Sequence, residues 1–361
     1  FVVLEKKEGK YCARIAEFYV YLHLIKTKVR KNIKNIKTMA ATRPYVIGLD
    51  LGGTNSVFGI VDKDAKIIAQ TSVKTGKDDP ETYVNRCVEA LKVIINNVGG
   101  IEKIHAMGIG APNGNFYSGM VEEAANLPWK GDVPLARMFE VKLGIPVVLT
   151  NDANAAAMGE MKYGVAKGMK NFMMITLGTG VGSGIVVDGK IVYGSDGFAG
   201  ELGHVIVEKH KGRQCGCGRK GCLETYCSAT GVARSAKEVI STSEVETKLR
   251  EIPLEDITSY DVFKAAMDGD PIAQSIYEFT GRLLGEACAN FTCFSSPEAY
   301  VFFGGLTKSG DLLMEPLRKA YDENVLRNYR GKTKLLISAL DDASAAVLGA
   351  SALGWDIERA D

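Results

Sequence analysis

Short apolar runs separated by glycine and aspartate dominate the first part of the chain. Residues 45–73, YVIGLDLGGTNSVFGIVDKDAKIIAQTSV, alternate β-branched stretches with a Gly-Gly turn and an Asp-rich turn, which predicts a meander of three strands. Residues 79–98 then place apolar side chains at helical spacing, among them Tyr83, Leu91 and Ile95. The runs IHAMGIGAP and IPVVLTND predict two buried strands, and the Ala-, Met- and Glu-rich residues after the second run favour a helix.

The same pattern begins again about 125 residues later. The run NFMMITLGTGVGSGIVVDGKIVYG predicts a strand, a glycine turn, a strand, an Asp-Gly hairpin and a strand. Residues 231–295 predict mainly helices, AYVFFGGLT a late buried strand, and ASAAVLGASAL a closing helix. Two such copies predict a duplicated α/β fold with a cleft between two lobes. We expect a small lobe at 43–150, joined by the closing helix at about 343–355, and a large lobe at 151–342 that carries a cysteine-rich segment.

Composition narrows the range of partners. The chain has 361 residues, of which 46% are hydrophobic and 24% charged, as in a globular protein large enough for two domains. Its net charge is +1, although the first 38 residues alone contain ten Lys or Arg and three Glu. The remainder is therefore mildly acidic and has no broad electrostatic reason to bind nucleic acid or a membrane. We expect small molecules and further copies of the chain as partners.

The basic leader, residues 1–42, is interpreted as lying outside the fold, with Met39 as the initiator. An amphipathic membrane-surface helix is the alternative, because apolar residues recur at helical spacing between positions 15 and 36. The segment has too many charges to span a bilayer and lacks the small-residue cleavage site of a secretory signal. We therefore expect a cytoplasmic protein with reduced cysteines.

Glycine turns follow three of the predicted strands. They contain Gly52 and Gly53, then Gly178 and Gly180, then Gly304 and Gly305. Each turn alone fits an ordinary tight hairpin, but three of them in a duplicated fold favour a nucleotide whose phosphates approach backbone N–H groups. No P-loop pattern is present, and the G-x-G-x-x-G match in GCGRKG follows no predicted strand.

Three polar residues at strand ends are candidates for chemistry. Asn151 and Asp152 stand where a buried strand gives way to a helix, where both residue types are also favoured as helix caps. An ionised Asp152 in the cleft could accept a proton from a sugar hydroxyl that attacks a phosphoryl group. Asp50 lies inside an otherwise apolar strand, and a water-mediated contact to Mg²⁺ would explain it.

Cysteines are concentrated in the segment GRQCGCGRKGCLETYC. Cys215, Cys217 and Cys222, with His204 of the GELGH run, can form a closed tetrahedral Zn²⁺ site that has no position for a catalytic water. The spacing departs from the usual zinc-finger pattern, so Cys227 and His210 remain alternative ligands. The isolated cysteines are predicted to be buried fillers: Cys12, Cys87, Cys288 and Cys293.

The runs LDLGGTN, NDANAAAMGE, LGTGVGSG, GELGH and CGCGRKGCLE resemble the ROK family of sugar kinases and sugar-responsive repressors, most of all its bacterial glucokinases. The resemblance covers residues 44–355. It implies an actin/hexokinase-like (ribonuclease H-like) two-lobed fold that transfers phosphate from ATP, with Mg²⁺, to the 6-hydroxyl of a hexose, glucose in the first place. A homodimer or homotetramer with a structural Zn²⁺ is implied as well.

The resemblance also assigns roles to individual residues. Asp152 would be the catalytic base, and the sugar would contact Asn151, Glu201, His204 and Glu224. The zinc ligands would be His204, Cys215, Cys217 and Cys222. The nucleotide would be bound by the three glycine turns, at Gly52, Gly53, Thr54, Asn55, Gly178, Thr179, Gly180, Gly304 and Gly305.

Three positions depart from the family pattern, which often has glycine at Asn113 and Gln214 and glutamate at Thr150. They leave the choice of hexose open, so kinases for N-acetylmannosamine, fructose or mannose are alternatives. A sugar-sensing transcriptional repressor is the alternative of a different class. A repressor would need a helix-turn-helix module, and the residues before PYVIGLD show one helical stretch without the helix, turn and recognition-helix pattern.

Overall fold

Two five-stranded sheets with the same strand plan form the framework. The computed structural model describes residues 43–124, 126–340 and 342–357, so the leader prediction for residues 1–42 lies outside the described residues. In the first sheet the order is β3-β2-β1-β4-β7, and in the second it is β10-β9-β8-β11-β12. In each sheet an antiparallel meander continues into three parallel strands. The prediction of a duplicated α/β fold is confirmed.

The first sheet contains the strands β1 (Tyr45–Leu51), β2 (Asn55–Asp62), β3 (Ile67–Lys74), β4 (Ile104–Ala111) and β7 (Val147–Asn151). Two helices cover one face of this sheet, α2 (Pro80–Asn97) and α3 (Leu135–Leu143). A short ribbon of β5 (Gly114–Asn115) and β6 (Met120–Val121) lies between β4 and α3 in the chain. We call this part the small lobe.

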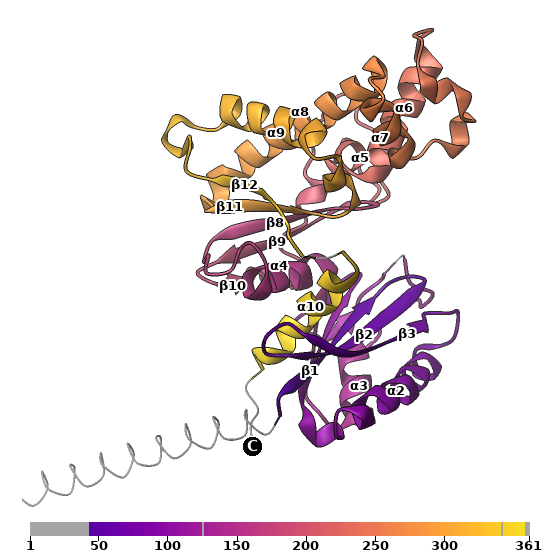
Figure 1. The fold of residues 1–361 in the computed structure, drawn as a ribbon, viewed down its shortest axis with the longest axis vertical. Helices are drawn as coiled ribbons and strands as arrows, with labels where there is room; N and C mark the ends of the chain where they lie inside the picture. The colour runs from indigo at the N-terminus through magenta and orange to yellow at the C-terminus, as the bar shows by residue number, and fades with distance from the viewer. Residues whose placement is uncertain (1–42, 125, 341, 358–361) are drawn as a thin grey trace, which may run out of the picture.

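The second sheet contains β8 (Phe172–Leu177), β9 (Val181–Val187), β10 (Lys190–Ile191), β11 (Ala299–Phe303) and β12 (Lys334–Ile337). Helices gather on its outer face (Figure 1), namely α5 (Glu224–Cys227), α6 (Ala229–Thr242), α7 (Ser259–Met267), α8 (Pro271–Ser295) and α9 (Asp311–Asn324). We call this part the large lobe. Buried apolar side chains from these helices and from β8 and β11 form its core.

Two helices lie between the sheets and join the lobes (Figure 1). They are α4 (Asp152–Tyr163), which packs on β8 and β9, and α10 (Asp342–Trp355), which packs on β1 and β4. The two helices contact each other closely at Gly159 of α4 and Gly349 of α10. A Cβ atom at Gly159 would lie only 2.9 Å from the Cα of Gly349, so a larger residue at this position would push the helices apart. A Cβ at Gly108 of β4 would lie 1.9 Å from the carbonyl oxygen of Ala350, so only glycine lets α10 rest on the strand backbone. The helix α10 therefore packs directly against the small-lobe sheet.

Two of the four cysteines that were predicted to be buried are confirmed, and Cys12 lies outside the described residues. Cys87 and Cys288 are buried, but Cys293 is exposed, so that prediction was wrong. Cys293 lies in the last turn of α8 beside the exposed Phe294, whereas the preceding Phe291 and Thr292 face the core, so it lies on the outward side of the helix. Among the residues that the structure describes, no helix has both the length and the apolar composition of a membrane-spanning segment.

Candidate functional site

The carboxyl ends of the parallel strands bring three polar side chains to one edge of the small-lobe sheet. Asp50 lies near the end of β1, opposite Gly110 of β4, and Asn151 ends β7, opposite Ala111. Asn151 also caps α4, because its Oδ1 accepts a hydrogen bond of 2.7 Å from the N–H of Asn154. Asp152 is therefore the first residue of the helix, at the sheet edge where ligands bind in open α/β folds.

Two negative charges at Asp50 and Asp152 would repel each other, and a bound metal ion or a proton would reduce this repulsion. Burial, and to a lesser extent the charge of Asp152, raise the pKa of Asp50 to about 6. The Asp152 side chain is accessible to water, yet many protein atoms surround it, and this desolvation raises its pKa as well. A hydrogen bond of 2.8 Å from the N–H of Ala153 to its Oδ1 acts in the opposite direction. A raised pKa is one property that is expected of a general base.

The GELGH run forms a single turn of 3-10 helix, Leu202–His204, with Glu201 at its N-cap position and His204 as its last residue. The Nε2 atom of His204 lies 3.9 Å from Oε2 of Glu201, while Nδ1 lies 3.7 Å from Sγ of Cys215. The two nitrogens of one ring therefore face different partners. Burial raises the pKa of Glu201, the His204 ring lowers it, and the charges of Asp152 and Glu224 raise it further. Glu201 is thus close enough to interact with Asp152 at the start of α4 and with Glu224 after the cysteine cluster.

Four side chains form a cluster with the composition of a zinc site. The ligand atoms of His204, Cys215, Cys217 and Cys222 all lie within 4.8 Å of one another. A tetrahedron with Zn–S bonds of about 2.3 Å has edges of about 3.8 Å. The Sγ atoms of Cys217 and Cys222 lie 3.7 Å apart, and Sγ of Cys215 lies 3.7 Å from Nδ1 of His204. The cluster therefore fits a tetrahedral Zn²⁺ ion in both donor types and spacing.

The two alternative ligands lie elsewhere. Cys227 is buried, and its thiol donates to the carbonyl oxygen of Thr280 at 3.6 Å. His210 is exposed, and its backbone N–H donates to the side chain of Glu208. Neither belongs to the four-residue cluster. The geometry therefore groups His204 with Cys215, Cys217 and Cys222, and it leaves Cys227 and His210 outside this group.

Glu224 links this cysteine cluster to a glycine turn. Its Oε1 accepts a hydrogen bond of 3.0 Å from the thiol of Cys215, and its Oε2 accepts one of 3.4 Å from the N–H of Val181. A Cβ atom at Gly180 would lie 2.6 Å from the same Oε2. Glycine at this position thus makes room for the carboxylate, a requirement that the sequence pattern did not reveal.

Two of the glycine turns meet at the carboxyl edge of the large-lobe sheet. The turn between β8 and β9 holds Gly178, Thr179 and Gly180, and Gly304 follows the neighbouring parallel strand β11. Gly304 has φ of +107°, and a Cβ there would lie 2.6 Å from the carbonyl oxygen of Leu177. Both the positive φ angle and the lack of space therefore disfavour any residue other than glycine at this position. Gly305 begins the short helix that follows β11.

Helix α6 begins directly beside the turn between β8 and β9. The N–H of Ala229 donates to the carbonyl oxygen of Gly178 at 2.9 Å, and the hydroxyl of Thr230 donates to that of Thr179 at 2.8 Å. The side chain of Ser228 caps this helix. The positive end of the helix dipole thus lies next to a turn with free space at Gly178, which suits a phosphate group.

The first glycine turn, Gly52–Asn55, connects β1 and β2 in the small lobe. Thr75, which follows β3, holds the turn with two hydrogen bonds. Its hydroxyl donates to the carbonyl oxygen of Gly52 at 2.6 Å, and its backbone N–H donates to the carbonyl oxygen of Thr54 at 2.9 Å. A Cβ at Gly53 would lie 2.5 Å from the carbonyl oxygen of Asn126. The turn is therefore rigidly supported and closely covered.

A cavity of about 320 Å³ is lined by residues of both lobes. Asn126 comes from the small lobe, whereas Thr179, Gly180 and Glu224 come from the large lobe. The remaining lining residues are Gln214, Cys215, Gly216, Thr225, Ser228, Thr230, Gly231 and Arg234. The cavity thus connects a sugar-site candidate, a zinc-ligand candidate and a glycine turn.

Sequence reasoning missed several residues of this cavity. Asn126 and Arg234 carry no motif, and their importance depends on contacts with distant segments. Ser228 could have been recognised as a helix cap, because serine before the ATGVAR run is a typical N-cap.

Asn113, one of the departures from the family pattern, has φ of +50°, where glycine is favoured, and its side-chain amide donates to the carbonyl oxygen of Glu122 at 3.0 Å. Asparagine therefore replaces glycine there at low cost.

The matching sheets, with two helices between them and polar residues gathered at their carboxyl edges, define an actin/hexokinase-like fold. The chain belongs to the ROK family, whose model matches residues 46–356.

Relatives of known function include both enzymes and regulators. The chain is 35% identical to a glucokinase of Halalkalibacterium halodurans over 323 residues, which is 87% of this chain and 95% of that protein. The structure of a ROK family glucokinase from Streptomyces griseus, in complex with glucose and AMPPNP, is similar with a TM-score of 0.70 and 33% identity, covering 86% of this chain and 98% of the other. A ROK family transcriptional regulator, a homologue of the E. coli MLC protein, has a TM-score of 0.76 at 25% identity, covering 86% and 77%.

Proposed function

We propose that the protein transfers the terminal phosphoryl group of ATP to the 6-hydroxyl of glucose. Curated relatives with 34–36% identity over most of the chain are glucokinases. The observation that carries the proposal is the position of Asp152. It directly follows β7 as the first residue of α4, and its charge is close enough to raise the pKa both of Asp50 and of Glu201, which lies beside His204.

In this proposal Asp152 takes the proton from the sugar hydroxyl as its oxygen attacks the phosphorus atom. Because desolvation raises its pKa, the carboxylate of Asp152, once ionised, is a better proton acceptor than that of an ordinary aspartate. Asn151, Glu201, His204 and Glu224 hold the other hydroxyls of the sugar. Their role is to fix the distance and direction of attack, because phosphoryl transfer depends mainly on positioning and charge stabilisation.

The donor lies on the glycine turns. Backbone N–H groups of the three glycine turns, at Gly52–Asn55, Gly178–Gly180 and Gly304–Gly305, together with the start of α6, approach the phosphates. When bound, Mg²⁺ neutralises phosphate charge, and Asp50 is the residue that would hold it through water. Zn²⁺ would be held by His204, Cys215, Cys217 and Cys222 and would orient the imidazole without taking part in the reaction.

The remaining parts of the proposal concern assembly and location. We propose that residues 43–150 with the helix at 343–355 move as one lobe, and residues 151–342 as the other, so that the cleft closes on the sugar. The family resemblance implies a homodimer or homotetramer, and we propose the cytoplasm as its location. A repressor role would require neither the base at Asp152 nor the phosphate turns, so these features favour the kinase.

The first test is a panel of hexoses with ATP and Mg²⁺, comparing wild type with Asp152→Asn. We expect glucose to be the best substrate, and the variant to lose about 10²–10⁴-fold in kcat while its glucose Kd changes little. Asp322→Asn, a matched change of an exposed aspartate on α9, serves as the control and should remain fully active. Near-normal turnover by Asp152→Asn would refute the assignment of the base. A wild type that turns over none of the sugars, and instead binds a DNA sequence specifically, would favour the repressor.

A further inference from the structure

Arg213 lies in the cysteine-rich segment but is not one of the four metal-ligand candidates. Its side chain is only 9% exposed, which is unusual for a charged residue. The guanidinium donates to Oε2 of Glu238 through Nε at 3.0 Å and Nη2 at 2.6 Å, and Nη2 also donates to Oγ of Ser235 at 2.9 Å. Nη1 donates to the carbonyl oxygens of Thr225 at 2.7 Å and Gly231 at 3.3 Å. All five N–H donors are therefore used within the protein.

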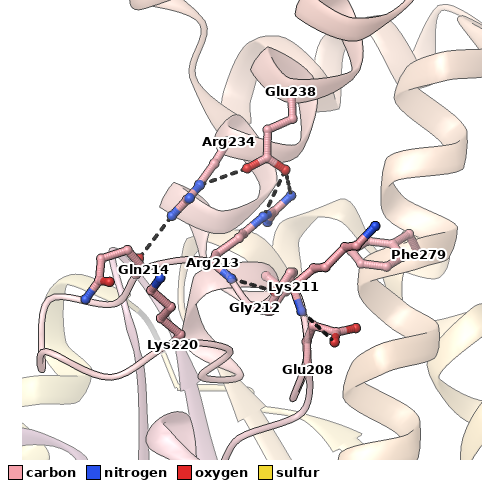
Figure 2. A pocket seen from close by; sticks show the side chains of 10 residues that line it. Glu208, Lys211, Gly212, Arg213, Gln214, Lys220, Arg234, Glu238 and Phe279 are labelled. Carbon is pink, nitrogen blue, oxygen red and sulfur yellow. Dashed lines mark hydrogen bonds and ion pairs between the residues drawn. The ribbon is translucent and has the colours of Figure 1, made fainter.

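Arg213 and its partners belong to three separate segments. Arg213 itself is two residues before Cys215, Thr225 is in α5 directly after Glu224, and Gly231 and Glu238 are in α6. Figure 2 shows the side chain of Arg213 reaching toward the Glu238 carboxylate. A single buried side chain thus connects the cysteine loop, the helix that starts at Glu224 and the helix that starts beside the glycine turn.

Tyr226 strengthens the same connection. Its ring lies under the guanidinium of Arg213, 4.5 Å from ring centroid to Cζ, and its hydroxyl accepts a hydrogen bond of 3.0 Å from the backbone N–H of Arg213. The position therefore requires a planar cation that can stack and donate in several directions at once. Lysine would keep the charge but has neither the plane nor the fork of donors.

Arg234 extends this set of contacts to the cavity between the lobes. It donates to Oε1 of Glu238 at 2.9 Å and to the carbonyl oxygen of Gln214 at 3.0 Å, and it lines the cavity that contains Thr179 and Glu224. Figure 2 shows Glu238 between the two arginines. The Glu238 carboxylate thus pairs with both arginines. Hydrogen bonds also hold the backbone N–H of Arg213 and the carbonyl oxygen of Gln214.

We infer that Arg213 is a positioning residue, which holds the cysteine loop against α5 and α6 so that Glu224 and the metal ligands are in place before substrates arrive. Its contacts lie outside the ligand set, so it acts on metal affinity only through the geometry of the loop. The catalytic consequence rests on the proposed kinase function. The consequence for zinc affinity and loop order does not.

The test compares wild type with Arg213→Lys, using the intact chain. We expect the affinity for Zn²⁺, measured by competition with a chromophoric chelator, to fall about 10–100-fold, as is typical when a residue supporting a ligand is changed. Amide hydrogen exchange across residues 213–235 should accelerate. The KM for glucose should rise more than kcat falls, because the misplaced Glu224 belongs to the sugar site.

Two further variants keep the inference falsifiable. Arg282→Lys alters an exposed arginine that pairs with Glu286 at 2.7 Å on α8, and it should change none of these quantities. Glu238→Gln leaves Arg213 in place but weakens its main acceptor, so it should move zinc affinity and hydrogen exchange in the same direction by a smaller amount, even if Arg213→Lys does not fold.

Unchanged zinc affinity, hydrogen exchange and KM in a folded Arg213→Lys or Glu238→Gln protein would overturn the inference. A wild type that phosphorylates no sugar would instead refute the proposed function, and the zinc and exchange measurements would still decide the role of Arg213.

Discussion

Replacing Asp50 with asparagine should make the protein more stable and less active. The pKa of Asp50 is raised from its ordinary value of 3.8 to about 6, chiefly by burial. The folded state therefore binds this proton more tightly than the unfolded chain, and stability is lost as the pH rises from about 4 to about 6. Above that range the folded protein carries the full cost of a desolvated carboxylate beside Asp152. Asparagine has the same shape without the charge, so the variant avoids the cost.

The size of the effect follows from the pKa difference. A shift of about two units corresponds to about 3 kcal/mol at pH 8, since each unit is worth about 1.4 kcal/mol. At pH 5 most of the folded protein is still protonated at Asp50, and the same relation gives about 1.5 kcal/mol. Asp50 is partly accessible to water, so these values are upper limits. The stabilisation by Asp50→Asn should therefore roughly double between pH 5 and pH 8.

Urea denaturation of wild type and Asp50→Asn at pH 5 and pH 8, without added divalent cations, measures this difference. Asp322→Asn on the exposed face of α9 is the control, and it should show almost no pH-dependent gain. In an Asp152→Asn background the gain from Asp50→Asn should be smaller, because one source of the raised pKa is removed. A gain that does not depend on pH, or a loss of stability at pH 8, would refute the reasoning. Kinase activity of Asp50→Asn should fall, because Asp50 is the proposed magnesium contact.

Three further predictions concern the sugar side of the cleft. Cys217→Ser should lower zinc content and raise the KM for glucose, which metal analysis and steady-state kinetics on the same sample would show, and a metal-free variant with normal KM would contradict the structural role of zinc. Gly180→Ala should push the carboxylate of Glu224 aside and weaken glucose binding about 10-fold or more in calorimetry without nucleotide, whereas Gly178→Ala, where a Cβ meets open space, should bind glucose normally. If both alanine variants bind alike, crowding at Glu224 is unimportant. The raised pKa of Asp152 should make kcat/KM fall on acidification at a pH above the ordinary 3.8 of an aspartate, and a profile that stays flat down to pH 4 would exclude Asp152 as the base.

The local pattern predicted the architecture because both lobes repeat one sequence of strands and turns. Alternating apolar runs and glycine turns report on neighbouring residues, so they identified the two meanders and the turns at their ends. The ligand cluster was also partly visible, since three of its members lie within eight residues and cannot be far apart in space. Cys293 shows the limit of the same reasoning: its surroundings in sequence are apolar, but its helix turns it away from the core.

Contacts between distant segments were decided only by the tertiary structure. Asn126 covers Gly53, and Arg213 reaches Glu238 two turns into a helix, although nothing in the spacing of these residues connects them. The closing helix, by contrast, was expected in the small lobe, but the glycines that let it touch both β4 and α4 were not recognised as contact points. Sequence periodicity determines which side of an element is buried, because burial depends on the residues of that element. Which elements meet depends on the packing of the whole chain, and so the partners of a charged or small residue become known only when the fold is complete.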